Sequence, residues 1–313
     1  MTAELPGSRR TTVTVGTFDG IHRGHQAVLA EIVARARAAD RAAVLVTFDP
    51  HPLEIVAPDR APALLTTADE RRLLWPLFGL DYVHVVRFTE AVRQMPPEAF
   101  VREVLIGRLR VGELVIGYDH GFGKDRSGDV EVLRRLGLEL GFAVDVVGPV
   151  EAGSEAISSS RVRRAVEAAD FAAAELALGR PYSALGQVER GAGRGRELGF
   201  PTANVRLADP RKCMPPDGVY AVRVELDGEF HDGMANLGAR PTFDETERVL
   251  EAHLLDWDGR PLYDARPTIE FVAHLRSIAR FDGPAALVRQ LEADRSAARA
   301  ALGPRGIVPG GVV

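Results

Sequence analysis

The sequence predicts an α/β protein of two domains, in which a parallel sheet covered by helices precedes an antiparallel β-barrel or sandwich with a terminal helix. Over residues 12–150, short apolar runs alternate with stretches whose apolar side chains recur every three or four positions. Beyond residue 185, strand-like runs follow one another with glycine and aspartate turns between them. The length of 313 residues is sufficient for two separate hydrophobic cores.

The composition excludes several classes of protein. With 46% hydrophobic and 27% charged residues, the chain has the balance of a globular protein. A formal net charge of -5 predicts no bulk attraction to nucleic acid or to an anionic membrane. Cys213 is the only cysteine, which excludes an intrachain disulfide and a multi-cysteine metal site. Residues 1–10 lack the apolar core of a signal peptide, and no apolar run reaches the about 18 residues of a membrane span, so we expect a cytoplasmic protein.

The first expected elements are a strand, a tight turn and a helix. Residues 12–16 alternate valine with threonine or glycine at the period of a strand. The Asp-Gly pair at 19–20 ends this strand, so we expect a helix that begins near His22 or Gly24 and contains residues 26–40.

Two histidines, His22 and His25, fall on one face of the first turn of that helix. The unpaired N–H groups and the positive end of the helix dipole favour an anion there. Together with two imidazole side chains, they predict a site for the phosphates of a nucleotide. The alternative interpretation is an exposed polar turn with two surface histidines.

The rest of the first half repeats this alternation. We expect strands at residues 43–48, 82–88, 113–118 and 143–147, and helices at residues 69–78, 97–109 and 128–140. In such sheets ligands bind beyond the carboxyl ends of the strands, where we expect His22, Asp49, His51 and Asp119. For Asp49 and His51, a turn shaped by neighbouring prolines is an alternative explanation.

A run of three serines, residues 158–160, precedes an expected helix at residues 162–178. Hydroxyl groups at this position either cap N–H groups or bind a phosphate. Arg163 and its arginine neighbours favour the second interpretation, because a guanidinium offers a forked donor to a triphosphate.

Residues 178–185, which include Gly179 and Pro181, end that helix and form the expected domain boundary. The strands expected in the second half are residues 205–207, 218–226, 249–256 and 267–272. An amphipathic helix is expected at residues 284–302, followed by a disordered tail at 304–313.

Four glycines between residues 191 and 199 form a flexible arch whose N–H groups can cradle phosphate oxygens. Thr202 and Asn204 follow it on one side of an extended segment, and they offer two oxygen ligands suited to Mg²⁺ bound to ATP. This is not a Walker loop, because the lysine and the helix of that motif are missing.

Seven motifs together carry a resemblance that covers nearly the whole chain. They are HRGH (22–25), TFDPHP (47–52), GYDHGFG (117–123), ISSSRVR (157–163), GRELGFPTAN (195–204), NLGARPTF (236–243) and EAHLLD (251–256). In this order they resemble nucleotidyltransferases of the His-x-Gly-His type and, within them, the bacterial bifunctional riboflavin kinase/FAD synthetases. The resemblance implies a Rossmann-like nucleotidyltransferase domain at residues 1–180 and an antiparallel β-barrel flavokinase domain with a terminal helix at residues 181–303.

The resemblance also implies two reactions. ATP would phosphorylate riboflavin to FMN in the second domain, and the first domain would transfer an adenylyl group from ATP to FMN, which gives FAD and pyrophosphate. The partners would be riboflavin, FMN and ATP with Mg²⁺, without nucleic acid or a membrane, and transient self-association is left open.

The motifs assign a role to each candidate residue. Glu251 is expected to be the general base toward the terminal ribityl hydroxyl, and His22 and His25 the catalytic residues of adenylyl transfer. His253, on the same strand face as Glu251, is expected to be structural, while Asn236 and Thr242 support the site. ATP is expected to bind Gly16, Phe18, His22, His25, Ser159, Ser160, Arg163, Gly195, Thr202 and Asn204, and flavin is expected to bind Asp49, His51, Asp119 and Phe200, with Thr202 and Asn204 also serving Mg²⁺.

Two residues depart from the family pattern: His120, where an aromatic residue is common, and Asp264, where glycine is common. Three alternatives remain open at this stage. They are an adenylyltransferase with another acceptor, such as a phosphopantetheine or a polyol phosphate, a nucleic-acid binder related to tRNA synthetases, and a flavin-binding regulator with inactive sites.

Overall fold

The computed structural model describes residues 9–118, 129–152, 155–190, 194–241 and 246–303. Over these ranges the backbone divides into two compact units. The first comprises Met1–Ala63 and Arg71–Ser159, and the second comprises Leu64–Glu70 and Ser160–Val313. A short segment from the first half of the sequence therefore belongs to the second unit.

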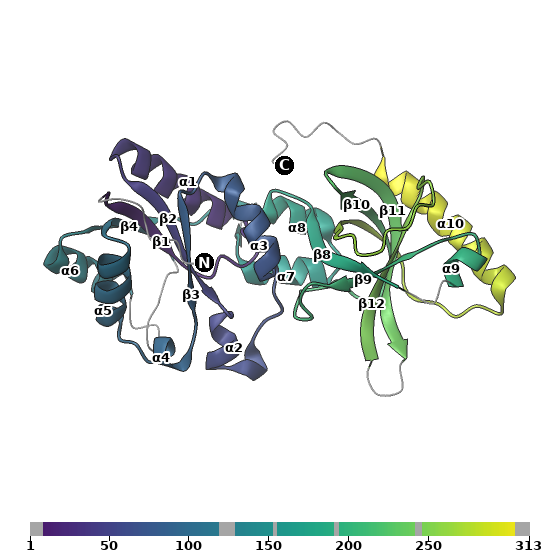
Figure 1. The fold of residues 1–313 in the computed structure, drawn as a ribbon, viewed down its shortest axis with the longest axis horizontal. Helices are drawn as coiled ribbons and strands as arrows, with labels where there is room; N and C mark the ends of the chain where they lie inside the picture. The colour runs from purple at the N-terminus through teal and green to yellow at the C-terminus, as the bar shows by residue number, and fades with distance from the viewer. Residues whose placement is uncertain (1–8, 119–128, 153–154, 191–193, 242–245, 304–313) are drawn as a thin grey trace. The chain divides into compact units, whose positions relative to one another are not determined.

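The first unit is built on a parallel sheet, which confirms the predicted fold class. Among the described residues it has five strands in the order β3-β2-β1-β4-β5, and each neighbouring pair is parallel (Figure 1). The strand order reverses between β1 and β4, which is where sheets of this kind bind ligands beyond their carboxyl ends. The strands are β1 (Thr11–Val15), β2 (Ala42–Asp49), β3 (Tyr82–Arg87), β4 (Val111–Gly117) and β5 (Ala143–Val147).

Apolar side chains cover both faces of this sheet. Successive residues of β2 point to opposite faces, so that Val44 joins one hydrophobic cluster and Leu45 the other. One cluster contains Leu29 of α1 (Arg23–Ala38), and the other contains Leu105 and Leu133 from later helices. Burial on both faces explains why β2 is a nearly continuous apolar run.

The helical elements of the first unit follow the predicted alternation, with some shorter than predicted. The predicted helix at 97–109 divides into a short α-helix and a π-helical stretch, and the one at 69–78 ends as a 3₁₀ turn before Gly79, whose φ is 66°. The elements are α1 (Arg23–Ala38), α2 (Pro52–Val56), η1 (Pro58–Arg60), α3 (Ala68–Leu74), η2 (Trp75–Phe78), α4 (Glu90–Arg93), α5 (Pro97–Phe100), η3 (Val101–Arg108) and α6 (Val130–Leu140), together with a small hairpin of β6 (Glu151–Ala152) and β7 (Glu155–Ala156).

The predicted single helix at 162–178 is wrong, because it consists of α7 (Ser159–Glu167) and α8 (Phe171–Leu178). Ala169 has a φ of 55°, which interrupts the helical path. The Asp170 carboxylate then caps α8 by accepting a 3.0 Å hydrogen bond from the N–H of Ala173. Phe171 stacks on Phe271 of the second unit, so α8 belongs to that unit although it precedes the predicted boundary at residue 180.

The second unit contains a closed antiparallel barrel, which decides between the predicted barrel and sandwich. Within the described ranges the strand order is β10-β11-β12-β9-β8-β13, and β10 closes the barrel by pairing with β13. The strands are β8 (Tyr182–Glu189), β9 (Ala203–Leu207), β10 (Gly218–Leu226), β11 (Glu229–Pro241), β12 (Thr246–Leu254) and β13 (Thr268–Arg276). A short helix, α9 (Arg194–Glu197), precedes β9.

The sequence prediction missed two of these strands, β8 and β11, and both contain glycines. At Gly186 in β8, a Cβ atom would lie 2.4 Å from a methyl group of Val205, and at Gly233 in β11 it would lie 3.0 Å from the carbonyl oxygen of His253. These glycines permit close packing of neighbouring strands, whereas glycine in a sequence more often indicates a turn.

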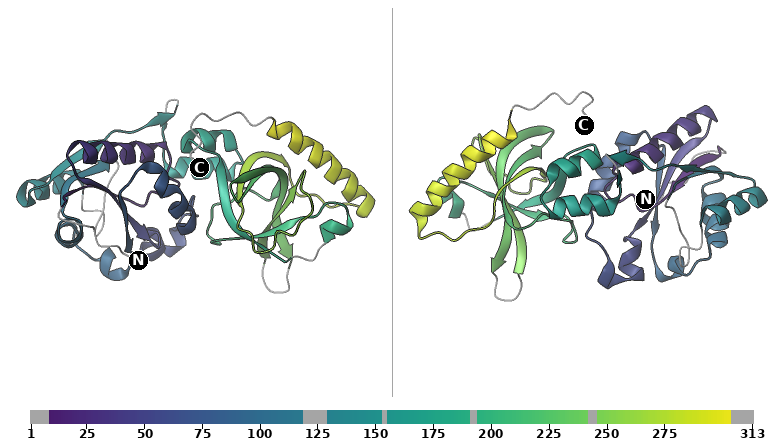
Figure 2. Two further views of the ribbon diagram at one scale, coloured as in Figure 1. Left: turned by 45° about the horizontal axis from the view of Figure 1, so that its top comes forward. Right: turned by 180° about the vertical axis from the view of Figure 1, so that it is seen from behind.

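The terminal helix, α10 (Pro284–Leu302), has the predicted bounds and packs along the outside of the barrel (Figure 2). Its Ala298 and Leu302 join a cluster with Phe200 and Met234. The described part of the chain has no helix that combines the length and the apolarity needed to cross a bilayer.

The segment Leu64–Glu70 is fixed in the second unit by a buried ion pair. The Lys212 ammonium lies 2.8 Å from the Glu70 carboxylate and donates a 2.7 Å hydrogen bond to the carbonyl of Leu65. The other oxygen of Glu70 accepts a 2.8 Å hydrogen bond from the N–H of Leu185 in β8. Both charged groups are thus satisfied inside the unit.

Candidate active sites

In the first unit, β1 and α1 are joined by a turn with an unusual backbone. Phe18, Gly20 and Ile21 have φ angles of 50°, 85° and 41°. His22 then caps α1, because its Nδ1 accepts a 3.3 Å hydrogen bond from the N–H of His25. The helix therefore begins at Arg23, between the two predicted starting residues.

The imidazole rings of His22 and His25 are stacked, with centroids 3.7 Å apart and an interplanar angle of 17°. The ring of Phe18 lies 4.7 Å from that of His25. Burial, and then the proximity of His22, hold the pKa of His25 well below its ordinary value. His25 is therefore a neutral imidazole at pH 7. Its Nδ1 atom is buried and has no hydrogen-bond partner among the described residues.

Glycines allow the backbone to approach these rings closely. A Cβ atom at Gly24 would lie 3.1 Å from the ring of His22, and one at Gly16 would lie 3.0 Å from the ring of Phe18. The start of the serine motif also meets this turn, because the Ser159 hydroxyl donates a 2.9 Å hydrogen bond to the carbonyl of Asp19. The turn thus has little freedom to rearrange.

Ser160 and Arg163 lie on α7 in the second compact unit. Ser160 is exposed and Arg163 is partly buried. Their assignment to ATP stays a prediction.

Asp49 is the last residue of β2 and His51 lies just beyond it, so both are at the predicted carboxyl end of this strand. His51 caps α2: its Nδ1 accepts a 3.2 Å hydrogen bond from the N–H of Leu53, and its own N–H donates to the Glu54 carboxylate at 2.9 Å. A structural role therefore accounts for His51, and its assignment to flavin stays a prediction. Asp119, another predicted flavin residue, lies outside the described residues, as do His120, Thr242 and the glycines at 191 and 193.

In the second unit, a cavity of about 330 Å³ contains three of the predicted residues in its wall, Gly195, Thr202 and Asn204. A Cβ atom at residue 195 would lie 2.3 Å from the carbonyl oxygen of Phe200 and 3.2 Å from the Thr202 hydroxyl. Glycine is therefore required for the chain to fold back toward Thr202. The ring of Phe200 is buried in the core against α10, and its predicted contact with flavin stays a prediction.

Glu251 lies in β12 between two strands that carry predicted residues. It pairs with Asn204 of β9 on one side and with Asn236 of β11 on the other. Glu251 is partly buried and does not itself line the cavity, whereas its strand neighbour Ala252 does. The strand register therefore places Glu251 next to Asn204, which lines the cavity.

His253 lines the same cavity. Its ring is buried, and its Nδ1 lies 2.8 Å from the carbonyl oxygen of Pro201. This contact holds the residue that precedes Thr202.

Comparison with known proteins relates these two sites to known families. A family model described as FAD synthetase matches residues 5–161, and one described as riboflavin kinase matches residues 178–302. A relative from Pseudomonas fluorescens, a bifunctional riboflavin kinase/FMN adenylyltransferase, is 41% identical over 96% of this chain and 95% of its own length. The chain belongs to the bifunctional riboflavin kinase/FMN adenylyltransferase family.

Other members and one solved structure extend the comparison. The bifunctional riboflavin kinase/FMN adenylyltransferase of Escherichia coli strain K12 is 38% identical over 92% of this chain and 91% of its own. A crystal structure described as a macrolide-efflux protein from Streptococcus pneumoniae has a TM-score of 0.82 and 32% identity, and it covers 94% of this chain and 95% of that one. That description applies to the pneumococcal protein. The likeness shows that the pneumococcal protein and this family member share a fold.

Sequence reasoning missed two groups of residues at these sites. Arg71 is almost fully buried beside Asp49, although arginines on helices usually face solvent. In the cavity of the second unit, the Arg260 guanidinium lies 4.4 Å from the ring centre of Trp257, and Tyr263 completes this part of the wall. For the second group, the sequence offered one signal: Trp257 and Tyr263 are two aromatic residues in one polar loop.

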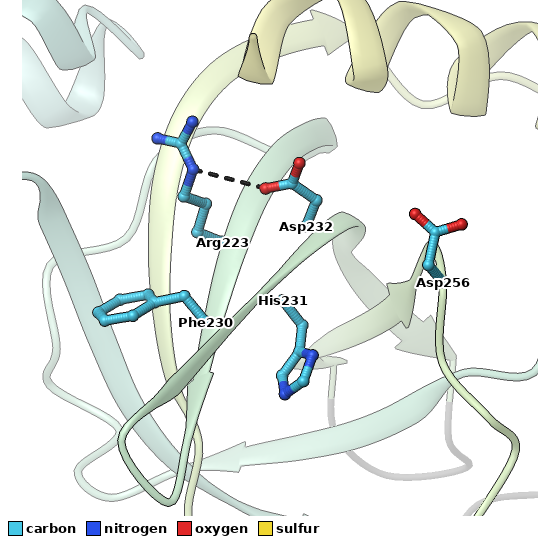
Figure 3. A pocket seen from close by; sticks show the side chains of 5 residues that line it. All are labelled: Arg223, Phe230, His231, Asp232 and Asp256. Carbon is cyan, nitrogen blue, oxygen red and sulfur yellow. Dashed lines mark ion pairs between the residues drawn. The ribbon is translucent and has the colours of Figure 1, made fainter. Parts of the chain in front are cut away.

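A second cavity in this family member, of about 340 Å³, contains none of the predicted residues (Figure 3). In its wall Arg223 lies 3.5 Å from Asp232, its partner on the neighbouring strand, and Asp256 is paired at 2.7 Å with Arg299 of α10. The charged side chains that line this cavity are paired with one another or with α10. A structural role therefore accounts for them.

Proposed function

We propose that the protein makes FAD from riboflavin in two steps, with one site in each of the two predicted domains, residues 1–180 and 181–303. The protein is a riboflavin kinase and FMN adenylyltransferase: ATP phosphorylates riboflavin to FMN, and a second ATP adenylates FMN with release of pyrophosphate. The observation that carries the proposal is the presence of two separate candidate phosphate sites in one chain. They are the stacked histidines at the start of α1 and the Gly195, Thr202 and Asn204 wall beside Glu251.

For the kinase step, we assign Glu251 as the general base. It would accept the proton of the terminal ribityl hydroxyl as that oxygen attacks the γ-phosphate of ATP. The oxygen donors of Thr202 and Asn204 fit Mg²⁺, and glycine at 195 leaves the Thr202 hydroxyl accessible, where a Cβ would lie 3.2 Å away. When bound with ATP, Mg²⁺ would neutralise phosphate charge.

For the adenylyl step, a phosphate oxygen of FMN would attack the α-phosphate of ATP, and pyrophosphate would leave. The site must hold both phosphates and stabilise the added negative charge. We assign this to His22, His25 and the turn of Gly16 and Phe18, and we assign the triphosphate also to Ser159, Ser160 and Arg163. A neutral His25 would act as a hydrogen-bond donor rather than as a cation.

We keep the remaining assignments as proposals. Asp49, His51, Asp119 and Phe200 would contact flavin, and residues 1–180 and 181–303 would be the adenylyltransferase and kinase domains. The partners would be the small molecules riboflavin, FMN and ATP, with neither nucleic acid nor a membrane, and the enzyme would act in the cytoplasm, where ATP is available.

The test is a time course. Purified protein is incubated with riboflavin, ATP and Mg²⁺, and the flavins are separated by chromatography. FMN that appears first and FAD that follows support the proposal. FMN alone would assign another acceptor to the first unit, and neither product, with reduced flavin also tried, would contradict both assignments. A shift of RNA in electrophoresis would instead support the nucleic-acid alternative.

A further inference from the structure

Arg71 is a buried cation at the proposed adenylyl-transfer site. It follows Glu70 in α3, and only 4% of its surface is exposed. One terminal nitrogen, Nη1, donates a 3.2 Å hydrogen bond to the carbonyl of Thr17. The other, Nη2, lies 3.7 Å from the carboxylate of Asp49. The Nε–H is buried and has no hydrogen-bond partner among the described residues.

These partners belong to the ends of two neighbouring strands. Thr17 lies in the turn between β1 and His22, and its carbonyl also accepts a 3.1 Å hydrogen bond from the Thr47 hydroxyl. Asp49 is the last residue of β2. Arg71 therefore connects the backbone of the histidine turn to a predicted flavin residue, at the edge where such sheets bind their ligands.

Neighbouring carboxylates only partly offset the effect of burial on the pKa of Arg71. Burial lowers the pKa of Arg71, and the carboxylates of Asp19 and Asp49 oppose that effect. Arginine is basic enough to remain charged. A guanidinium has five N–H donors, and the hydrogen bonds and ion pair described for Arg71 do not use all of them.

We propose that Arg71 is a positioning residue for adenylyl transfer, which holds the Thr17 carbonyl and the Asp49 carboxylate in place and sets a fixed positive charge beneath the phosphate site. The inference rests on the proposed function. Arg71 would act through the turn and through Asp49, rather than as the group that reacts. Its preorganised charge would favour the transition state, in which negative charge increases, over the ground state.

The test compares Arg71→Met, Arg71→Lys and the control Arg72→Met, whose wild-type side chain is exposed on the same helix. We expect Arg71→Met to lower kcat for FAD formation from FMN by roughly 10- to 100-fold with a smaller change in KM. Arg71→Lys should restore part of kcat, because it keeps the charge but loses the forked geometry. Riboflavin phosphorylation in the same preparations should stay within about twofold of wild type, as a control for folding.

A double-mutant cycle with Asp49→Asn tests the proposed partnership. If the two residues act as a unit, the double variant should be no slower than the slower single variant. Additive losses would contradict the partnership. FAD formation by Arg71→Met within about twofold of wild type, or equal losses of both activities, would overturn the inference. Absence of FAD formation by the wild type would instead contradict the proposed function.

Discussion

His25 combines burial, a stacked neighbour and a depressed pKa at the centre of the first site. The folded state keeps it neutral, whereas the unfolded chain protonates it near its ordinary pKa of 6.5. Below that value the unfolded state therefore binds more protons, and stability falls as pH falls. Above pH 6.5 the contribution of neutral His25 to stability is fully present.

We therefore expect the first unit of the wild type to lose stability between pH 7.5 and 5.5, by up to about 1.4 kcal/mol per pH unit below the unfolded pKa. The His25→Asn variant, whose residue 25 does not titrate, should lose less stability over the same pH range. Urea unfolding at both pH values measures the difference. His84, whose pKa burial also lowers, is present in both proteins and cancels. Parallel losses in the two proteins would contradict the assigned state of His25.

Gly195 makes a second prediction at the residue scale. In Gly195→Ala, a Cβ 2.3 Å from the Phe200 carbonyl must displace the backbone beside Thr202, which costs about 1–3 kcal/mol. Riboflavin phosphorylation should fall at least about tenfold, and FAD formation from supplied FMN should be unchanged. Gly148→Ala is the control, because no heavy atom beyond its two chain neighbours lies within 4 Å of its added Cβ. Full kinase activity in Gly195→Ala would show that this close approach is not required.

At the scale of elements, the buried pair of Lys212 and Glu70 fixes the segment Leu64–Glu70 in the second unit. Lys212→Met leaves the Glu70 carboxylate buried without its cation, so we expect a loss of about 3–5 kcal/mol in the free energy of unfolding. Denaturant unfolding followed by circular dichroism measures it.

The neighbouring Arg211→Met is the matched control, because its ion pair with Asp209 is exposed and should contribute no more than about 1 kcal/mol. The double variant Glu70→Gln, Lys212→Met should recover part of the loss, since the amide oxygen can still accept from Leu185. Equal, small effects of Lys212→Met and Arg211→Met would indicate that the buried pair contributes little.

The elements that the sequence predicted are those whose local pattern and tertiary environment agree. The strand β2 is an almost continuous apolar run because both of its faces are buried, and α10 begins with proline at its first position. β8 and β11 were missed because Gly186 and Gly233 serve close strand packing, which only the folded chain reveals. The histidine turn was predictable because the spacing of its motif is local. The position of Arg71 was not, since it depends on the ends of two distant strands.

At the scale of the whole molecule, we propose one reaction in each of the two predicted domains, residues 1–180 and 181–303. The first unit contains the stacked histidines, and the second contains the cavity wall of Thr202 and Asn204 beside Glu251. The two family models match these parts of the chain in the same order. If the sites are chemically independent, each reaction can be removed without the other.

The most direct test assays two single variants with riboflavin and, separately, with FMN. His22→Asn keeps an oxygen that can cap α1, and Glu251→Gln keeps the size of the side chain. We predict that Glu251→Gln loses riboflavin phosphorylation by about 100-fold or more but still converts FMN to FAD, and that His22→Asn does the reverse. Loss of both reactions in either folded variant, or the opposite pattern of losses, would contradict the assignment of one reaction to each predicted domain.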